Sequence, residues 1–244
     1  MMNKTKFPKF FQHSHEPEII AQRLKKGIQH SYLKDFVYGA FDGLVTTFAV
    51  VSGVTGAQLD HRTIIILGFA NLVADGFSMA ASNYLGTRTQ NQERELLEEY
   101  ERSQVQQNPL GESHEVREIF IQQGQEGELL EKNIEFILKD KKRWVNFMLA
   151  EEYGHRGPPR SPFKAAGLTY LAFIIFGLTP LLAYIFHWNG PFLKATLMTT
   201  FGFFVIGLVK GIWTVGSIWI SGFKTFLIGS LASALAYYVG QYFS

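Results

Sequence analysis

The chain has 244 residues, of which 47% are hydrophobic, 15% aromatic and only 18% charged, and its formal net charge is +2. This composition is too apolar for an ordinary soluble domain of the same length, so it predicts an integral membrane protein. Because the chain contains no cysteine, disulfides, zinc–thiolate sites, iron–sulfur clusters and cysteine nucleophiles are excluded. Any bound metal ion must be held by oxygen, nitrogen or thioether ligands.

Residues 1–34 form a polar, basic arm. The arm is not expected to be a cleavable signal peptide, because the first long apolar run begins only at Phe36 and continues into a membrane-spanning segment. Apolar residues recur in the arm at helical spacing beside basic ones, which predicts a short amphipathic helix lying on an anionic membrane surface. These apolar residues are Ile20, Leu24, Ile28 and Tyr32.

Five apolar segments are each about 20 residues long, the length that a helix needs to cross a bilayer. Because lipid offers no hydrogen-bond partner to an open backbone, and barrel strands would be shorter and alternating, these segments predict helices. The expected fold class is an all-α membrane protein with five transmembrane helices. The segments are Phe36–Ala57, Ile64–Leu85, Ala165–Phe186, Phe192–Ile212 and Phe223–Phe243.

The distribution of Lys and Arg predicts the orientation of the chain. The arm holds seven of them, whereas the turns at Asp60–Arg62 and His187–Lys194 hold one each. We therefore expect the arm, and after two crossings the long polar insert, to be cytosolic. The expected domains are the arm (1–34), transmembrane helices one and two (35–86), a cytosolic helical insert (87–160) and transmembrane helices three to five (161–244).

Acidic residues mark a route through the membrane. Asp42 lies near the middle of the first apolar segment, where a carboxylate is costly unless it faces a cavity, a partner or a cation. Asp35 lies two turns before it, and Asp75 and Met79 lie in the second segment. Since no Asp or Glu follows Glu152, the first two helices hold every acid at membrane depth. We interpret them as the lining of a cation path; for Met79 and Asp75, simple packing or polar contacts between helices are open alternatives.

Two helices cannot surround an ion, but four can. We therefore expect a homodimer with the path on its two-fold axis, where two copies of Asp42 and Met79 meet. Gly39 and Gly43, four residues apart, would permit the close helix approach that this needs. The lipid bilayer is the other expected partner, and no nucleic acid is expected to bind.

The insert is expected to be soluble, with a first helix at Asn91–Gln107 that continues the second membrane-spanning segment. Further helices are expected at Ser113–Gln123, Glu126–Lys139 and Trp144–Tyr153. Carboxylates gathered on facing helices would form an oxygen-rich site for divalent cations, and a nearby thioether favours transition metals over Mg²⁺ or Ca²⁺. The alternative is that these acids form solvated helix faces, paired with the Lys and Arg of the same segment. Candidate ligands share helix faces in pairs, namely Glu98 with Glu101, Glu112 with Glu115, and Met148 with Glu152.

Two motifs resemble those of a known family. They are Asp42-Gly43-Leu44-Val45-Thr46-Thr47-Phe48-Ala49-Val50-Val51-Ser52-Gly53, and Ala74-Asp75-Gly76-Phe77-Ser78-Met79-Ala80 with Tyr84-Leu85. Together they closely resemble the vacuolar iron transporter family, and the resemblance runs from about Lys34 to the C-terminus. It implies a dimer of five-helix subunits that moves Fe²⁺, and often Mn²⁺, out of the cytosol in exchange for protons.

The resemblance also implies roles for single residues. It makes Asp42 and Met79 metal ligands in the membrane path and Asp35 a carboxylate at the cytosolic mouth of that path. It makes the insert a metal-binding domain with ligand positions at Glu101, Glu112, Glu115, Met148 and Glu152. The chain departs from the family pattern where Ser31, Asn71 and Gln104 replace acids and Leu149 replaces a methionine. Asp75 and Glu98 are the residues expected to compensate for the missing acidic ligands.

These features predict a proton-coupled exporter of divalent transition metal, with the metal as substrate and no prosthetic group. An enzyme is not expected, because a di-iron carboxylate site uses two Glu-x-x-His units and the chain has one, Glu152 to His155. A membrane-anchored oxidase of that kind and a metal sensor without transport are the alternatives. Nucleotide-driven pumping is not expected, since no phosphate-binding loop motif is present. A bacterial cytoplasmic membrane is favoured over a vacuolar one, because no sorting signal is legible.

Overall fold

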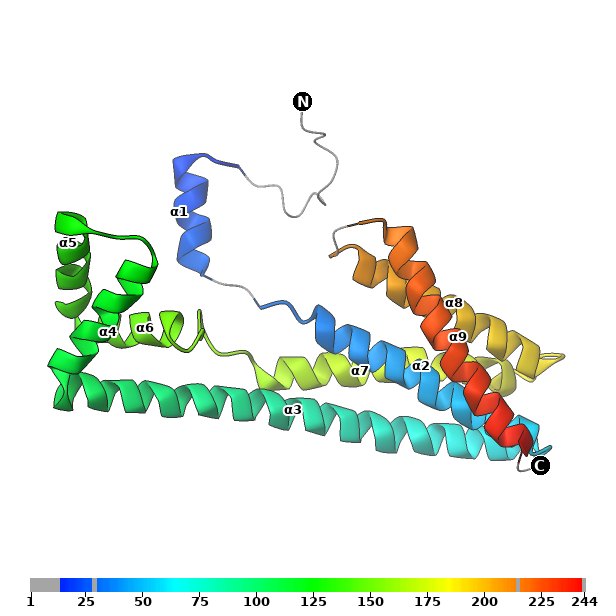
Figure 1. Ribbon diagram of the computed structural model, residues 1–244. Helices are drawn as coiled ribbons and strands as arrows, with labels where there is room; N and C mark the ends of the chain where they lie inside the picture. Colours follow the sequence, from blue (N-terminus) through cyan, green and yellow to red (C-terminus); the bar gives the residue numbers. More distant parts are fainter. Residues whose placement is uncertain (1–13, 28–29, 214–215, 243–244) are drawn as a thin grey trace. The chain divides into compact units, whose positions relative to one another are not determined.

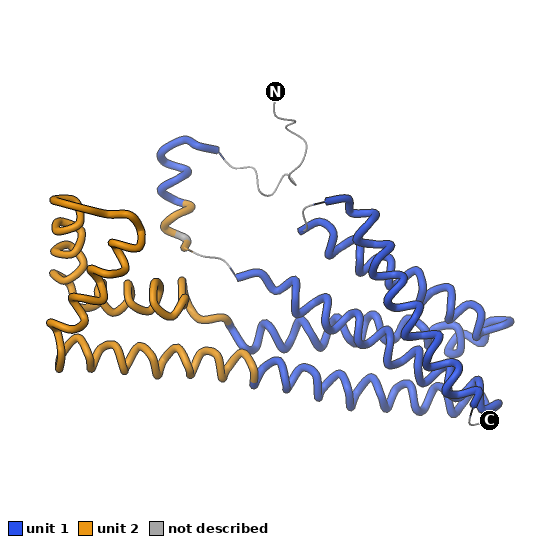
Figure 2. The backbone as a smooth tube through the Cα atoms, viewed as in Figure 1, with its two compact units in different colours: residues 1–22, 30–85, 161–244 blue, residues 23–29, 86–160 orange. Residues whose placement is uncertain are grey.

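The computed structural model describes residues 14–27, 30–213 and 216–242, which form nine helices and no strand (Figure 1). The chain divides into two compact units (Figure 2). Unit 1 comprises residues 1–22, 30–85 and 161–244, and unit 2 comprises residues 23–29 and 86–160. The long helix α3 (His61–Gln107) contributes residues to both units. The predicted all-helical fold is confirmed for the described residues.

Five described helices are long and apolar enough to cross a membrane, as the sequence predicts. They are α2 (Leu33–Gly56), the apolar part of α3, α7 (Pro162–Ile185), α8 (Pro191–Gly211) and α9 (Ile218–Tyr242). Their bounds lie within a few residues of the predicted segments; Phe243, the expected end of the last segment, lies outside the described residues. The chain is therefore an integral, multi-pass membrane protein.

Gly39 and Gly43 let α2 lie directly against α7 within unit 1. A Cβ atom at Gly39 would collide with the carbonyl group of Thr169, and one at Gly43 with that of Phe173. The prediction that these two glycines serve contact between two copies of the chain is therefore wrong. Their lack of a side chain is used inside the subunit, because the backbones of α2 and α7 leave no room for a methyl group.

Within unit 1, the apolar part of α3 contacts the other helices mainly through side chains. A Cβ atom at Gly68 would meet the side chain of Leu181, and one at Gly76 would meet ring atoms of Phe173. Leu72 of α3 belongs to the buried core with Phe173, Leu181, Phe48 and Val51. This core holds α3 against the bundle and leaves the other side of the helix exposed.

Unit 2 contains the polar end of α3, α4 (Pro109–Gln122), α5 (Gly127–Leu138) and α6 (Lys141–Glu151). Two of its helices begin earlier than predicted because polar side chains cap them. Asn108 Oδ1 accepts from the Gly111 backbone N–H at 3.2 Å, and Asp140 Oδ1 accepts from the Lys142 N–H at 2.9 Å. Each cap satisfies an amide that would otherwise lack a partner, so α4 starts at Pro109 and α6 at Lys141.

The arm contains a helix, but it is shorter than the predicted repeat of apolar residues. Helix α1 covers Pro17–Lys26, and Gly27 follows in a left-handed conformation with φ +67°, which ends the helix. Ile28 lies outside the described residues. Tyr32 is not part of α1; its hydroxyl accepts a hydrogen bond from the Ser161 backbone N–H at 3.2 Å.

Replacing Gly39 with Ala should destabilise the protein by about 1–3 kcal/mol, the usual cost of overpacking a tight contact. Gly53, on the same helix, is the matched control, because a Cβ atom there meets nothing within 4 Å. Gly53→Ala should be neutral or should stabilise by up to about 1 kcal/mol through helix propensity. The measurement is thermal unfolding of the detergent-solubilised protein. Equal midpoints for the two variants would contradict the direct contact of α2 with α7.

Candidate functional site

Asp42 lies half-buried on α2 beside polar groups of α3. Its carboxylate is close enough to that of Asp75 for the two to repel each other, and no salt bridge in the described part of the chain neutralises it. The Thr46 hydroxyl donates to the backbone oxygen of Asp42 at 2.9 Å. The Asn71 amide donates to that same hydroxyl oxygen at 3.3 Å. A chain of polar groups therefore joins α2 and α3 next to the Asp42 carboxylate.

Asp35 is buried in a junction of three helices, with only 3% of its surface exposed. The Asn83 amide of α3 donates to Asp35 Oδ1 at 2.9 Å and to Thr169 Oγ1 of α7 at 2.7 Å. The Thr169 hydroxyl in turn donates to the backbone oxygen of Asp35 at 3.2 Å. A carboxylate at the open mouth of a path would face water, whereas this one ties α2, α3 and α7 together. No sequence motif pointed to Asn83 or Thr169.

The two candidate residues in the middle of α3 differ in environment. Met79 is partly buried and packs against the apolar core that contains Leu72 and Phe173. Asp75 is exposed, on the side of α3 that also presents Val73 and Phe77, which are 61% and 69% exposed. The structure thus places Asp75 near Asp42, while the contacts of Met79 in a single chain are those of a packing residue.

In unit 2, two glutamates are buried without basic partners. Glu101 on α3 is 1% exposed and Glu112 on α4 is 5% exposed, and one carboxylate oxygen of each, Oε2, has no hydrogen-bond partner among the described residues. The Tyr153 hydroxyl donates to the other oxygen of Glu101 at 3.0 Å. Unpaired buried carboxylate oxygens are costly in a folded protein. This arrangement therefore needs a proton or a cation.

Glu112 belongs to a cluster of four acids with Glu101, Glu115 and Glu152, here called the acidic cluster. Burial, and then the negative charges of the other three, raise the pKa of Glu112 to about 7. Burial also raises the pKa of Glu152, and the charge of Glu115 adds to the effect. The cause is that low dielectric and like charges both disfavour ionisation. Glu112 is thus the member of the acidic cluster that can exchange a proton for positive charge near neutral pH.

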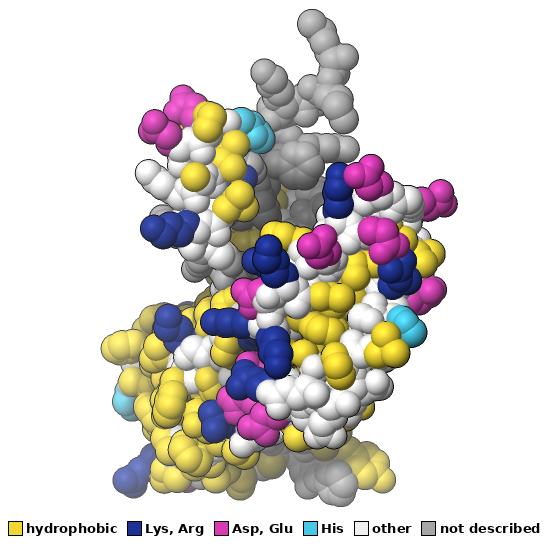
Figure 3. Space-filling model, turned by 90° about the vertical axis from the view of Figure 1, so that its left-hand side faces the viewer, with side chains coloured by type: hydrophobic (Ala, Val, Ile, Leu, Met, Phe, Trp, Pro, Cys, Tyr) yellow, Lys and Arg dark blue, Asp and Glu magenta, His cyan; other side chains and the backbone are white. Residues whose placement is uncertain are grey.

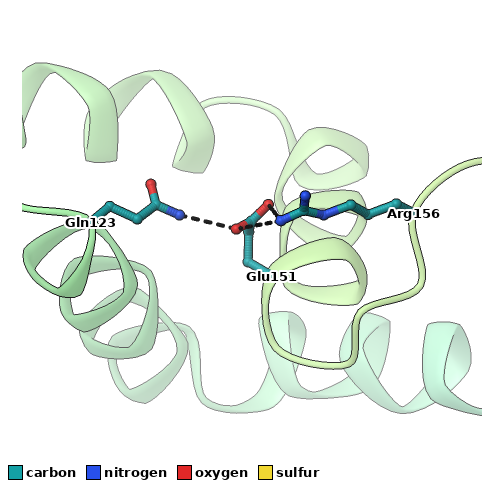
Figure 4. Close-up of polar contacts among 3 residues, drawn as sticks. All are labelled: Gln123, Glu151 and Arg156. Atoms are coloured by element: carbon teal, nitrogen blue, oxygen red, sulfur yellow. Dashed lines mark hydrogen bonds and ion pairs between the residues drawn. The ribbon is translucent and has the colours of Figure 1, made fainter. Parts of the chain in front are cut away.

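Other glutamates of unit 2 do form the ordinary surface pairs that the sequence left open as an alternative. Glu98 pairs with Arg102 at 2.8 Å, so its predicted role as a compensating ligand is not supported by its position. Glu151, next to Glu152, is held by Arg156 at 3.0 Å and by the Gln123 amide at 3.0 Å (Figure 4). Among the described residues, no such pair forms at any member of the acidic cluster.

The remaining predicted ligand, Met148, is completely buried in the apolar core of unit 2. Leu149, where the resemblance implies a methionine, is buried in the same core. No group of three or more His, Asp or Glu side chains in the described part of the chain is arranged closely enough to hold a metal ion. The acidic cluster therefore has the composition of an oxygen-rich metal site, but its side chains do not converge on one point in this conformation.

Comparisons with known proteins agree with this membrane architecture. The model of the VIT family matches residues 33–241, so the chain belongs to this family. It is 32% identical over 213 residues to vacuolar iron transporter 1 of Tulipa gesneriana, covering 84% of each protein. It is 27% identical over 240 residues to the vacuolar iron transporter of Plasmodium berghei (strain Anka), covering 93% of this chain and 88% of that protein. Membership implies metal-ion transport with iron as a substrate, and these relatives are transporters, not enzymes.

Without bound metal, ionisation of Glu112 should weaken the fold of unit 2. Its pKa of about 7 lies above the ordinary value of 4.5, so the folded protein binds more protons than the unfolded chain between these values. Stability should therefore fall as the pH rises through this window. Glu112→Gln should remove up to about 3 kcal/mol of this loss.

The measurement is the unfolding midpoint in a metal chelator, with Glu112→Gln gaining over the unmodified protein at pH 8 and not at pH 5. Glu118→Gln is the matched control, because Glu118 lies exposed on the same helix, and it should show no such pH-dependent gain. A gain for Glu112→Gln that is equal at both pH values would mean that its carboxylate is not held protonated in the folded state.

Proposed function

We propose that the chain is a proton-coupled transporter that exports Fe²⁺, and also Mn²⁺, from the cytosol. The observation that supports this is the pair of carboxylates Asp42 and Asp75 on apolar helices, close enough to repel each other and without a salt bridge in the described residues. Charge at membrane depth is costly unless a partner of opposite sign is present. A single divalent cation would relieve both carboxylates at once.

The exposed side of α3 supports a homodimer. It combines large apolar residues with Asp75, Ser78 and Ser82, and lipid would be a poor neighbour for that carboxylate. A second copy related by a two-fold axis would cover this side and bring two copies of Asp42 and Asp75 to one path. Met79 would then join the path only if α3 shifts its contacts with the core.

Proton coupling would follow from competition at the same oxygens. A metal ion binds the ionised carboxylate and a proton binds the same group, so each displaces the other. If the site opens alternately to the two sides of the membrane, metal moving one way is exchanged for protons moving the other way. In the same manner the acidic cluster of unit 2 would collect metal on the cytosolic side, with Glu101, Glu112, Glu115 and Glu152 as ligands and Met148 beside them.

This proposal places the arm and unit 2 in the cytosol, as the basic residues of the arm predict. The relatives named above are called vacuolar, which gives no support to the preference for a bacterial membrane. The direction of transport does not depend on that choice, because both membranes have the cytosol on one side.

Transport should depend on the Asp42 carboxylate. In proteoliposomes with an acidic lumen, Fe²⁺ entry should be accompanied by alkalinisation of the lumen, and Asp42→Asn should reduce both fluxes at least tenfold. Asp60→Asn is the control, because Asp60 caps α3 by accepting from the Thr63 N–H at 2.8 Å and Asn caps equally well. Metal flux that persists in Asp42→Asn would contradict the proposal.

Metal binding by unit 2 should strengthen with pH. Because Glu112 must lose its proton, and its pKa is about 7, the affinity for Mn²⁺ should rise between pH 6 and pH 8. Glu112→Gln should weaken binding and flatten this pH dependence, and Glu118→Gln should change neither. Titration calorimetry on the solubilised protein provides the measurement. An Mn²⁺ affinity that does not change with pH would show that metal binding does not require Glu112 to lose its proton.

Two copies should cross-link through α3. The chain has no native cysteine, so Val73→Cys introduces one thiol on the exposed side of that helix. Oxidation should give a covalent dimer for Val73→Cys and not for Leu231→Cys, which places a thiol on a residue of α9 that is similarly exposed, 64% against 61%. A dimer band for Leu231→Cys alone would show that the interface lies at α9 and not at α3.

A further inference from the structure

A cleft with basic walls lies in unit 2, between α3 and α6. It has a volume of about 480 Å³, within the usual range for small-molecule sites. Arg102 and Gln106 line it from α3, and Lys141, Lys142 and Asn146 line it from α6. Figure 3 shows that Lys and Arg side chains gather on the face turned to the viewer. The cleft is therefore positively charged in a segment, residues 86–160, that has 15 acidic and 11 basic residues.

Lys141 and Lys142 form no salt bridge within the described residues. Arg117, Lys132 and Arg156 each form a salt bridge with a glutamate. Arg102 is likewise held by Glu98, at 2.8 Å, and that glutamate also lines the cleft. The positive charge of the cleft thus comes mainly from two adjacent lysines.

The position of these lysines is unfavourable for the protein itself. They are the first two residues of α6, where the helix dipole favours negative charge, which the Asp140 carboxylate at the N-cap already supplies. They are also neighbours in sequence and repel each other. An anion bound between them would relieve this repulsion.

The lining of the cleft indicates which anion fits. Lysine binds phosphate as a point charge, and the planar fork of arginine matches phosphate as well as carboxylate. The one arginine that lines the cleft is already engaged by Glu98. The amides of Gln106 and Asn146 offer hydrogen bonds, and Val105 and Val145 give the cleft an apolar part. The volume exceeds the need of a single inorganic phosphate.

We propose that this cleft binds a phosphate-bearing organic anion. The same chemistry is available from two sources, a soluble sugar or inositol phosphate and the phosphorylated headgroup of a membrane lipid. The site uses no member of the acidic cluster and neither Asp42 nor Asp75, so it goes beyond the proposed transport function and does not depend on it.

The test uses the full chain in phosphatidylcholine nanodiscs, with EDTA present so that no metal bridges the ligand. Inositol trisphosphate is titrated by calorimetry and should bind saturably. The double variant Lys141→Gln/Lys142→Gln should weaken binding at least tenfold. Lys132→Gln/Lys139→Gln makes the same change of charge outside the cleft and should change affinity less than twofold.

A second variant, Asn146→Asp, places a negative charge in the cleft at an exposed position and should also weaken binding. It tests the site independently if the lysine variant fails to fold. The titration is repeated in nanodiscs that contain phosphatidylinositol bisphosphate. A lower apparent affinity for inositol trisphosphate would mean that the lipid headgroup occupies the cleft, and an unchanged affinity would mean that the cleft binds the soluble compound. Either result supports the site. No saturable binding, or equal loss in the two lysine variants, would overturn it.

Discussion

The constraint on which this protein depends is the cost of keeping carboxylates away from basic partners. Asp42 and Asp75 lie close together on apolar helices, and Glu101 and Glu112 each bury an oxygen without a hydrogen-bond partner in the described residues. Such groups lower the stability of a metal-free, ionised protein. Their cost falls when a proton or a cation binds, and this same property allows the two to be exchanged.

The helices of unit 1 divide the tasks of packing and of presenting charge. Gly39 and Gly43 join α2 to α7 at backbone contact, and Asn83 ties the buried Asp35 to Thr169. These interactions fix one side of α2 and α3 inside the subunit. The other side of α3 keeps its carboxylate and its large apolar residues exposed, which is why a second copy is the natural cover in our proposal.

In unit 2, the distinction between surface charge and site charge rests on pairing. Glu98 and Glu101 are three residues apart on one helix, yet Glu98 is bound to Arg102 while Glu101 is buried beside Tyr153. Glu151 and Glu152 are adjacent, and Arg156 and Gln123 bind only the first of them. None of the four glutamates of the acidic cluster forms a salt bridge among the described residues.

The sequence by itself determined the five membrane-length helices, the long polar extension of α3 and the family, because apolar length, composition and contiguous motifs are local properties of the chain. It also predicted most helix ends, but α4, α6 and α9 start earlier than predicted. For α4 and α6 the reason is the capping by Asn108 and Asp140, which depends on single side chains. Only the tertiary structure decided that Gly39 and Gly43 face α7, that Asp35 is buried and that Glu101, not Glu98, joins the acidic cluster. Each of these depends on which residues, often far apart in sequence, come into contact, and helical spacing alone does not specify that contact.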